Sequence, residues 1–443
     1  MSRPHETEAF LLTILIQLVV IIAIARVAGN LSRRLGHPIV VGEILAGLIL
    51  GPSFLGRLFP DVFKVLFPAS SNSTINVISQ IGLIFLMFLI GLEFDFGHIR
   101  SHGKTAALVA LSGIAFPFLL GLVVAWWMWP AFPHMNRVGF LLFLAAALSI
   151  TAIPILGRVM VEFNIQRTHL GALTITAAAI DDALGWILLA VVAAIVGAHF
   201  DPAVTLRMIS LTVLFALIMG FVVRPLLIRW IHTAVDARTG QLSLNALATT
   251  IVLVLLSAIA TNLIGIFSIF GAFVLGAVLY DQERFREAVF QRLKDFITVF
   301  FLPVFFTYTG LHTDMGSLGS GMMWIFLLGL LAASFVGKFV GCTIAARLSG
   351  LSTRMAACVG IMMNTRALMG LIAANVGLQM GAIPGQVYCM IVLMCVLSTI
   401  MLSPILRRLI MGTELQEPFL RSEFMREAMQ RRSLPVRENA AAG

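Results

Sequence analysis

The chain has 443 residues, of which 59% are hydrophobic and only 12% are charged, and its mean hydropathy is +1.00. Soluble domains carry about 25% charged residues, so this composition excludes an ordinary soluble protein. Apolar runs of roughly 18 or more residues recur from near the N-terminus to about Arg407, which predicts an all-α polytopic membrane protein. The net charge of +9 is spread over short loops, so we interpret it as a topological signal and expect no nucleic-acid partner.

Cysteine and histidine usage gives no sign of a cofactor or a resident metal. The nine histidines are scattered, and the HExxH motif does not occur. The cysteines lie in apolar segments without a CxxC pattern, as small buried hydrophobic residues do: Cys342, Cys358, Cys389 and Cys395. We therefore expect no cofactor, no disulfide framework and no structural metal site.

The apolar runs between polar breaks predict thirteen transmembrane spans, at residues 9–30, 39–57, 74–94, 105–129, 137–161, 169–197, 204–228, 243–264, 266–281, 290–311, 321–348, 354–379 and 385–412. Of the 30 Lys and Arg residues, 22 lie on one set of loops and in the tail, and 5 lie on the opposite side. Positively charged loops face the cytoplasm. The N-terminus is therefore expected outside and the C-terminus in the cytoplasm, in a multi-pass protein of the bacterial inner (plasma) membrane.

The remaining three basic residues fall within the spans. Arg26 lies near the cytoplasmic end of the first span, where its long side chain is expected to snorkel to the membrane surface. Lys338 and Arg366 lie too deep for snorkelling. Both need buried partners, because an ionised side chain in the hydrocarbon region is costly.

The odd number of spans suggests an internal symmetry. If the seventh span is a linker, two six-span halves of opposite orientation remain, as in many transporters built from inverted repeats. The fifth and twelfth spans then correspond, and both are interrupted, by "ALSITAIPILG" (147–157) and "MMNTRALMG" (362–370). Paired interruptions of this kind indicate a binding site near the membrane midplane.

Two adjacent carboxylates occupy the middle of the sixth span, in "TAAAIDDALGWILLA". Asp181 and Asp182 lie about twelve residues into the span, roughly 18 Å along a helix. The alternative, that they cap a helix beginning at Ala183, would leave the preceding segment too short to cross and its backbone unsatisfied in lipid. We therefore predict that the pair is functional.

The chemistry predicted for these acids is exchange of a cation and a proton. Asp182 is expected to bind either a proton or a cation, and Asp181 to pair with Lys338 while the site holds no transported ion. A permanent structural ion pair is the alternative for Lys338. Oxygen ligands suit a hard alkali cation.

The two interrupted spans are expected to contribute further residues to this site. In the fifth span, Ser149, Thr151 and carbonyls freed by Pro154 offer oxygen ligands. In the twelfth, Asn364 and Arg366 could neutralise helix-end dipoles. For Arg366 a structural role and a direct transport role are both open.

Several motifs, in order along the chain, resemble the monovalent cation:proton antiporter-2 family of the cation:proton antiporter superfamily. They span nearly the whole membrane region: "GHPIVVGEILAGLILGPS", "FLIGLEFD", "AIDDALGW", "GIFSIFGAFVLGAVL", "LPVFFTYTGL" and "NTRALMGLI". The resemblance implies the sodium/proton antiporter fold, with crossed discontinuous helices, a homodimer and elevator-type movement. The domains implied are a dimerisation or scaffold domain (9–95 and 243–311), an ion-binding core (105–197 and 321–412), a linker helix (204–238) and a short cytoplasmic tail (413–443).

The resemblance also assigns roles to the charged residues. The second aspartate of the family, which binds the ion or proton, corresponds to Asp182, and the first, paired with a lysine in electrogenic members, to Asp181 and Lys338. Many relatives have an acid two residues after the arginine of the twelfth span, where this chain has Leu368. The tail after Ile410 contains no GxGxxG unit, so the nucleotide-binding module of potassium-efflux relatives is not expected.

The function predicted is secondary transport, not enzyme catalysis. We expect electrogenic sodium (or lithium)/proton antiport, with the transported cations, protons and the lipid bilayer as partners. The alternatives are potassium/proton antiport by the same family and a sodium-coupled organic anion symporter. An intramembrane aspartyl protease is disfavoured, because its two aspartates lie on different helices and the GxGD motif does not occur here.

Overall fold

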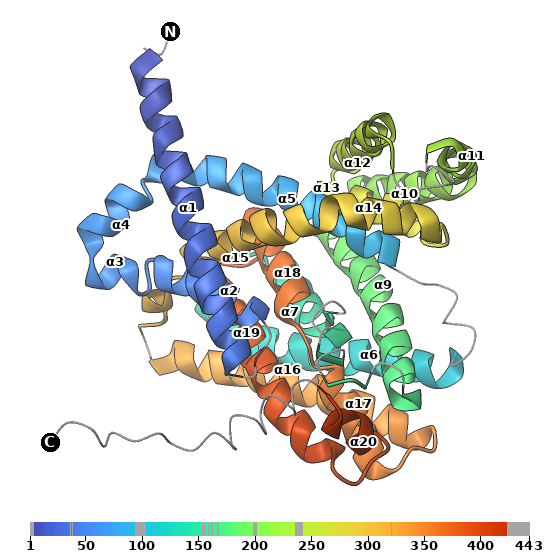
Figure 1. Ribbon diagram of the computed structural model, residues 1–443. Coiled ribbons are helices and arrows are strands. Elements are labelled where there is room, and N and C mark those ends of the chain that lie inside the picture. Colours follow the sequence, from blue (N-terminus) through green and yellow to red (C-terminus); the bar gives the residue numbers. More distant parts are fainter. Residues whose placement is uncertain are drawn as a thin grey trace, which may run out of the picture.

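The structure is a computed structural model that describes residues 4–35, 37, 39–93, 103–152, 156–157, 159–160, 163–165, 168–197, 202–234, 242–319 and 321–422. Its regular elements, over these residues, are all helical, which confirms the predicted all-α class (Figure 1). The fifth and twelfth spans are both interrupted, also as predicted. Most of the tail, residues 423–443, lies outside the described residues, and the part before it forms a short helix, α20 (Gln416–Leu420).

The first half of the chain forms α1 (Pro4–Arg34), α2 (Ile39–Leu50), α3 (Leu55–Leu58), α4 (Pro60–Leu66), α5 (Asn72–Glu93), α6 (Gly103–Met128), α7 (Arg137–Ser149) and α9 (His169–Gly197). The second half forms α10 (Pro202–Ile218), α11 (Arg224–Ala234), α12 (Leu244–Ile264), α13 (Ser268–Ala277), α14 (Glu283–Phe296), α15 (Leu302–Leu311), α16 (Gly321–Leu348), α17 (Thr353–Met362), α18 (Ala367–Gln379) and α19 (Gly385–Ile410). Two π-helical segments join α10 to α11 and α14 to α15, and are η4 (Met219–Val223) and η5 (Ile297–Phe301).

Ten helical segments of the described chain are long and apolar enough to cross a membrane. Shorter apolar helices, among them α7, α13 and α17, lie within the other predicted spans. The total of thirteen spans therefore stays a prediction. The second predicted span, 39–57, is longer than α2, which ends at Leu50 and is followed by a turn and α3.

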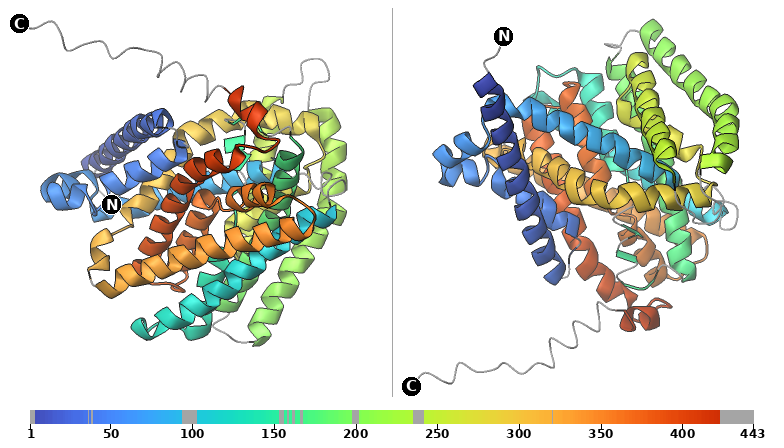
Figure 2. Two further views of the ribbon diagram at one scale, coloured as in Figure 1. Left: turned by 90° about the horizontal axis from the view of Figure 1, so that it is seen from below. Right: turned by 45° about the horizontal axis from the view of Figure 1, so that its top comes forward.

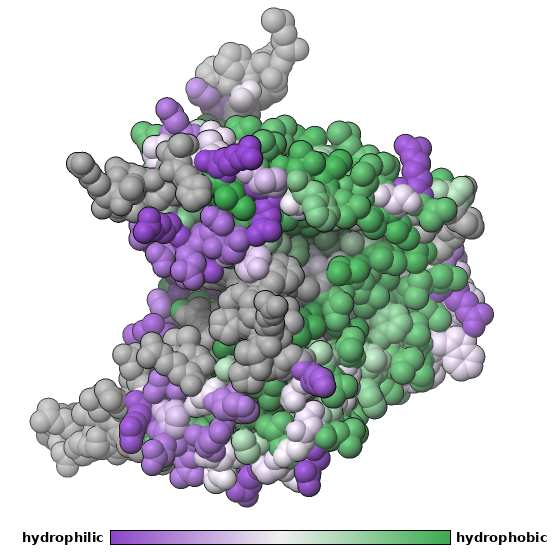
Figure 3. Space-filling model, turned by 90° about the vertical axis from the view of Figure 1, so that its right-hand side faces the viewer, coloured by the Kyte–Doolittle hydropathy of each residue, from purple (hydrophilic) through white to green (hydrophobic). Residues whose placement is uncertain are grey.

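Helices from both halves of the chain pack together in two groups. In one, α6 packs on α16, α7 and α9, and α17 and α18 pack on α19. In the other, α2 packs on α1 and α15, and α13 packs on α5 and α12 (Figures 1 and 2). Helix α10 contacts a member of each group, α9 and α12. The molecular surface in Figure 3 has a broad hydrophobic area between two edges with hydrophilic side chains, as expected for a membrane-embedded protein.

Arg26 on α1 contacts the π-helical segment η5. Its guanidinium Nη2 donates to the carbonyl oxygen of Thr298 over 3.0 Å. The bond joins α1 to this π-helical segment, a winding that is rare in helices. The side chain therefore binds a neighbouring helix instead of only reaching toward the membrane surface, as its position in the first span suggested.

Backbone contact between glycines holds α2 against α15. A Cβ atom added at Gly310 would overlap the backbone of Gly47, and one added at Gly47 would lie 2.6 Å from the carbonyl oxygen of Phe306. In membranes, small residues allow such close approach of two helices.

We expect Gly310→Ala to force α2 and α15 apart and to lower the free energy of unfolding by about 1–3 kcal/mol. The matched control is Gly220→Ala in η4, because a Cβ added there has no heavy atom within 4 Å. Thermal unfolding of both variants in detergent checks the prediction. Equal melting temperatures for the two variants would contradict it.

Candidate functional site

The adjacent carboxylates lie within one continuous helix. Helix α9 runs from His169 to Gly197 without a break, and both Asp181 and Asp182 are fully buried. The capping alternative is therefore wrong, because no helix begins after Asp182. Two acids thus occupy a buried position that apolar helices surround.

Asp181 is fully paired. The ammonium of Lys338 on α16 donates to Asp181 Oδ1 over 2.7 Å, and neither side chain is exposed. Asp181 Oδ2 accepts the backbone N–H of Thr151 over 3.1 Å. Lys338 Nζ also donates to the carbonyl oxygen of Ser149, 2.5 Å away, at the end of α7. The interrupted span therefore supplies backbone partners to both members of the ion pair.

The two helix interruptions bind each other. The backbone N–H of Ala152 donates to the carbonyl oxygen of Thr365 over 2.7 Å, and the Thr365 hydroxyl donates to the Ala152 carbonyl over 3.2 Å. The Thr151 hydroxyl donates to the carbonyl oxygen of Met363 over 3.3 Å. In a membrane, non-helical backbone is stable only where such partners exist. Pro154, which we expected to free further carbonyls, lies outside the described residues.

Arg366 lies between α17 and α18 and is fully buried. Its guanidinium donates to the carbonyl oxygens of Leu148, at the end of α7, and of Ser334, at 2.8 Å for the latter, and to Asn364 Oδ1 over 3.3 Å. A cation at the C-terminal end of a helix is favoured by the helix dipole. Arg366 contacts the end of α7 in this way, whereas Asn364 only accepts a hydrogen bond from the guanidinium. The dipole-neutralising role of the two residues stays a prediction.

Asp182 differs from its neighbour in having no hydrogen-bond partner for either carboxylate oxygen among the described residues. When all four buried side chains are ionised, the charges of Asp181, Asp182, Lys338 and Arg366 sum to zero. The cluster is thus electrically balanced without any bound ion, although Lys338 bonds directly to Asp181 alone of the two acids. An acid that is buried and unpaired is the position in this cluster best suited to bind a proton or a cation.

The structure places the other predicted oxygen ligands close to the ion pair. The Ser149 hydroxyl donates to the carbonyl oxygen of Ala145 over 2.8 Å, within α7. It is the backbone of Ser149, not its hydroxyl, that contacts Lys338. The Ser149 and Thr151 hydroxyls each keep lone pairs that can accept or coordinate, so their role as cation ligands stays a prediction.

One polar group near Asp182 was not predicted from the sequence. Trp186 lies one helical turn after Asp182, is 3% exposed, and its indole Nε1 has no hydrogen-bond partner among the described residues. The sequence signal is the spacing of four residues in "DDALGW", but a Trp in an apolar run usually indicates packing alone.

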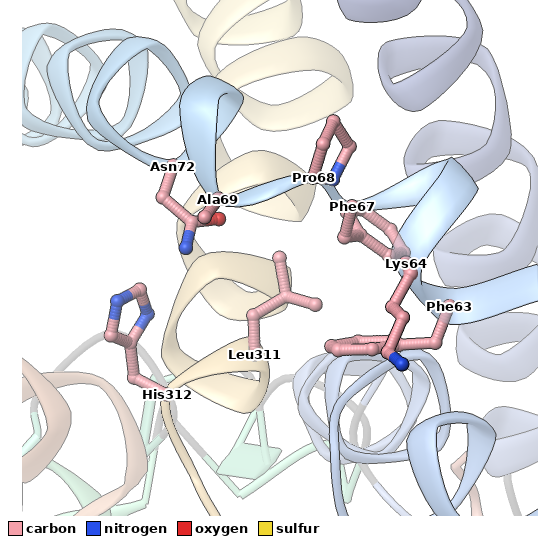
Figure 4. A pocket seen from close by; sticks show the side chains of 8 residues that line it. All are labelled: Phe63, Lys64, Phe67, Pro68, Ala69, Asn72, Leu311 and His312. Atoms are coloured by element: carbon pink, nitrogen blue, oxygen red, sulfur yellow. The ribbon is translucent and has the colours of Figure 1, made fainter. Parts of the chain in front are cut away.

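A separate cavity of about 430 Å³ opens elsewhere, between α4, the start of α5 and the end of α15 (Figure 4). Its lining includes Lys64, Asn72 and His312 together with the rings of Phe63 and Phe67. None of the predicted site residues lines it. The cavity is therefore not part of the charged cluster.

Comparison with known families decides what kind of chain this is. The family model described as "sodium/hydrogen exchanger, transmembrane" matches residues 19–408. The chain belongs to this exchanger family. The predicted membership of the cation:proton antiporters is thereby confirmed.

Individual relatives of this exchanger-family chain come from bacteria, plants and fungi. It is 38% identical over 403 residues to the Na(+)/H(+) antiporter NhaS4 of Synechocystis sp., covering 89% of this chain and 96% of the relative. It is 30% identical to K(+)/H(+) antiporter 1 of Saccharomyces cerevisiae, over 92% of this chain but only 46% of the relative. The chain spans about half the length of that yeast protein and of the plant cation/H(+) antiporters it matches.

Among solved structures, the chain is similar to the sodium/proton antiporter MjNhaP1 from Methanocaldococcus jannaschii, with a TM-score of 0.61. The match covers 93% of this chain and 99% of the other, at 16% sequence identity. At this identity the likeness shows the fold alone. It confirms the predicted sodium/proton antiporter fold.

Proposed function

We propose that this protein is a secondary-active monovalent cation:proton antiporter in which Asp182 binds the proton and the cation in turn. The observation that supports the proposal is the difference in hydrogen bonding between Asp181 and Asp182. Asp181 is bonded through both oxygens, whereas Asp182 is equally buried and has no partner among the described residues. The membership of the sodium/hydrogen exchanger family supports the same conclusion.

Competition between the proton and the cation for the carboxylate of Asp182 is sufficient to couple proton transport to cation transport. A buried carboxylate without a partner is costly, so Asp182 is stabilised by either ligand. One carboxylate cannot be fully neutralised by both, because a second positive charge would have to be buried without compensation. A cation that binds from one side therefore displaces the proton, and the reverse happens on the other side.

For the transported ion, sodium with lithium is our first choice. The Asp-Asp-Lys set resembles sodium exchangers, and a relative covered over 96% of its length is named a Na(+)/H(+) antiporter. Potassium is the second candidate, because the yeast relative is named a K(+)/H(+) antiporter and the Bacillus cereus relative GerN a Na(+)/H(+)-K(+) antiporter. We infer no sodium-coupled organic anion transport, since every named relative above exchanges a cation for protons.

We further propose electrogenic exchange. If the single cation that binds Asp182 also displaces Lys338 from Asp181, the Lys338 ammonium can release its proton. That proton and the one released by Asp182 then move in exchange for one cation, so net charge is transported. The direct bond between Lys338 Nζ and Asp181 Oδ1 supports this step, because a cation arriving next to it competes with the ammonium.

The movement that we propose is of the elevator type, in a homodimer. We assign 105–197 and 321–412 to one domain and 9–95 and 243–311 to another. The packing of α6 on α7, α9 and α16, and of α2 on α1 and α15, supports this division. The first group holds the charged cluster and would move as the core, while the second would serve as the scaffold and dimerisation domain. The residues 204–238 would link the two groups.

The test is cation-evoked proton release in proteoliposomes that contain a pH-sensitive dye. Addition of sodium, lithium or potassium, each against choline as an inert cation, is expected to change dye fluorescence only when the protein is present. The cation that acts at the lowest concentration identifies the substrate. A protein that is correctly reconstituted yet inert to all three cations between about pH 6 and pH 9 would refute antiport.

A further inference from the structure

We propose that Trp186 is the hydrogen-bond donor to the ionised carboxylate of Asp182, and that its indole N–H sets how protons and cations compete for this acid. The inference rests on the proposed function and adds a positioning residue to it. It follows from three features of the structure, which are helix register, burial and packing.

Helix register brings the two side chains together. Asp182 and Trp186 are four residues apart on the continuous helix α9, so they lie on the same face of it. Long side chains on a helix lean toward its N-terminus, over the preceding turn. The indole of Trp186 is therefore expected over the turn that carries Asp182, on the same face of α9 as the carboxylate.

Burial favours a hydrogen bond between the indole N–H of Trp186 and the carboxylate of Asp182. Trp186 Nε1 and both carboxylate oxygens of Asp182 have no bonded partner among the residues that the structure describes. An indole N–H is a donor only, and an ionised carboxylate is an acceptor only. Leaving both unpaired in an apolar interior is costly, so a small rotation of the carboxylate that forms the bond is favoured when Asp182 is ionised.

Packing fixes where the indole can be. Its ring lies edge-on to Phe270 of α13, with centroids 5.5 Å apart and planes at 87°, and its centroid is 5.7 Å from that of Phe273. Helix α13 belongs to the packing group that does not hold the charged cluster. The donor is therefore anchored by the opposite group, and the bond to Asp182 depends on how the two groups are placed.

The charged groups near Asp182 are Asp181, its neighbour on the same helix, and Lys338 on α16, which bonds to Asp181. Helix α13 contributes aromatic rings. Because Lys338 bonds to Asp181, the indole is the polar donor assigned to Asp182 itself. Loss of the indole N–H favours the protonated form of Asp182 over the ionised form, because a neutral carboxyl group gains less from this hydrogen bond than a carboxylate does.

The test compares Trp186→Phe, which keeps an aromatic ring and removes the N–H, with the wild-type protein in proteoliposomes. We expect the pH of half-maximal exchange to rise by about one unit, and the apparent KM for the cation at about pH 7 to rise about tenfold. At about pH 9, where few protons compete, KM and the maximal rate should approach the wild-type values.

The matched control is Phe270→Leu, which removes one of the two rings that pack on Trp186 and keeps both the Phe273 ring and the indole N–H in place. A purely structural role for Trp186 predicts that both variants lose rate at every pH and that neither moves the pH profile. Our proposal is overturned if Trp186→Phe leaves the profile unmoved, or if Phe270→Leu moves it as far. Absence of exchange in the wild-type protein would refute the proposed function itself.

A second pair of variants applies if Trp186→Phe does not fold. In Trp186→Gln and Trp186→Met the two new side chains are similar to each other in size and shape, but only Gln carries an N–H donor. We expect Trp186→Gln to keep a pH profile closer to the wild type than Trp186→Met does. Identical profiles for the two variants would overturn the proposal.

Discussion

Replacement of Asp182 by Asn is expected to reduce cation:proton exchange to the level of protein-free liposomes. The amide has nearly the same shape as the carboxyl group but neither binds and releases a proton nor carries a negative charge for the cation. Since both oxygens of Asp182 are without a protein partner in the described chain, the substitution breaks no hydrogen bond that the fold needs. The loss should therefore be one of function and not of folding.

The measurement is dye fluorescence after addition of sodium, lithium or potassium, with monodispersity in detergent as the check on folding. The matched control is Asp61→Asn, the same chemical change on the exposed short helix α4. We expect the control to exchange at the wild-type rate. Substantial exchange by a folded Asp182→Asn protein would show that the ion-binding acid lies elsewhere.

Removal of Lys338 is expected to have the largest effect on stability. Lys338→Met leaves the carboxylate of Asp181 buried without its cation, and also leaves the carbonyl of Ser149 without this donor. Removing one partner of a buried ion pair costs about 3–5 kcal/mol. The variant should therefore melt at a clearly lower temperature than the wild type at neutral pH.

The double variant Asp181→Asn, Lys338→Met separates the ion pair from the general effect of substitution. We expect it to recover much of the stability lost in Lys338→Met, because no unpaired charge remains. Lys104→Met, on the exposed first turn of α6, is the control for loss of a lysine. Additive losses in the double variant would mean that Lys338 and Asp181 do not stabilise each other.

The long helices could be predicted closely from the sequence. The predicted ranges 169–197 and 321–348 coincide with α9 and α16, because both are uninterrupted apolar runs that end at polar residues or glycine. The interruptions after Ser149 and Met362 were also predictable, since polar residues there are incompatible with a simple lipid-facing helix.

The contacts across the site could not be predicted in the same way. The mutual hydrogen bonds of Ala152 and Thr365 join residues more than 200 positions apart in the chain, and hydropathy holds no information about which interrupted segments meet. That the N–H of Trp186 is unpaired among the described residues could not be predicted either. A Trp in an apolar run predicts only a packed ring, and the surroundings of its nitrogen are known only from the structure. The π-helical segments η4 and η5 were missed since a local change of winding leaves the hydropathy of a span unaltered.

The wider turn at η5 has a consequence for how this protein can change by insertion and deletion. A π-helical turn arises when one extra residue is accommodated in an α-helix, and each residue turns an α-helix by about 100°. Deleting one residue between Ile297 and Phe301 would leave the length of the span almost unchanged but rotate α14 by that angle. The side of α14 that now buries Phe285, Ala288 and Val289 would be replaced by one rich in charged residues. The presence of one residue in η5 thus decides which face of α14 is buried. A hydropathy profile of the sequence would not identify that residue.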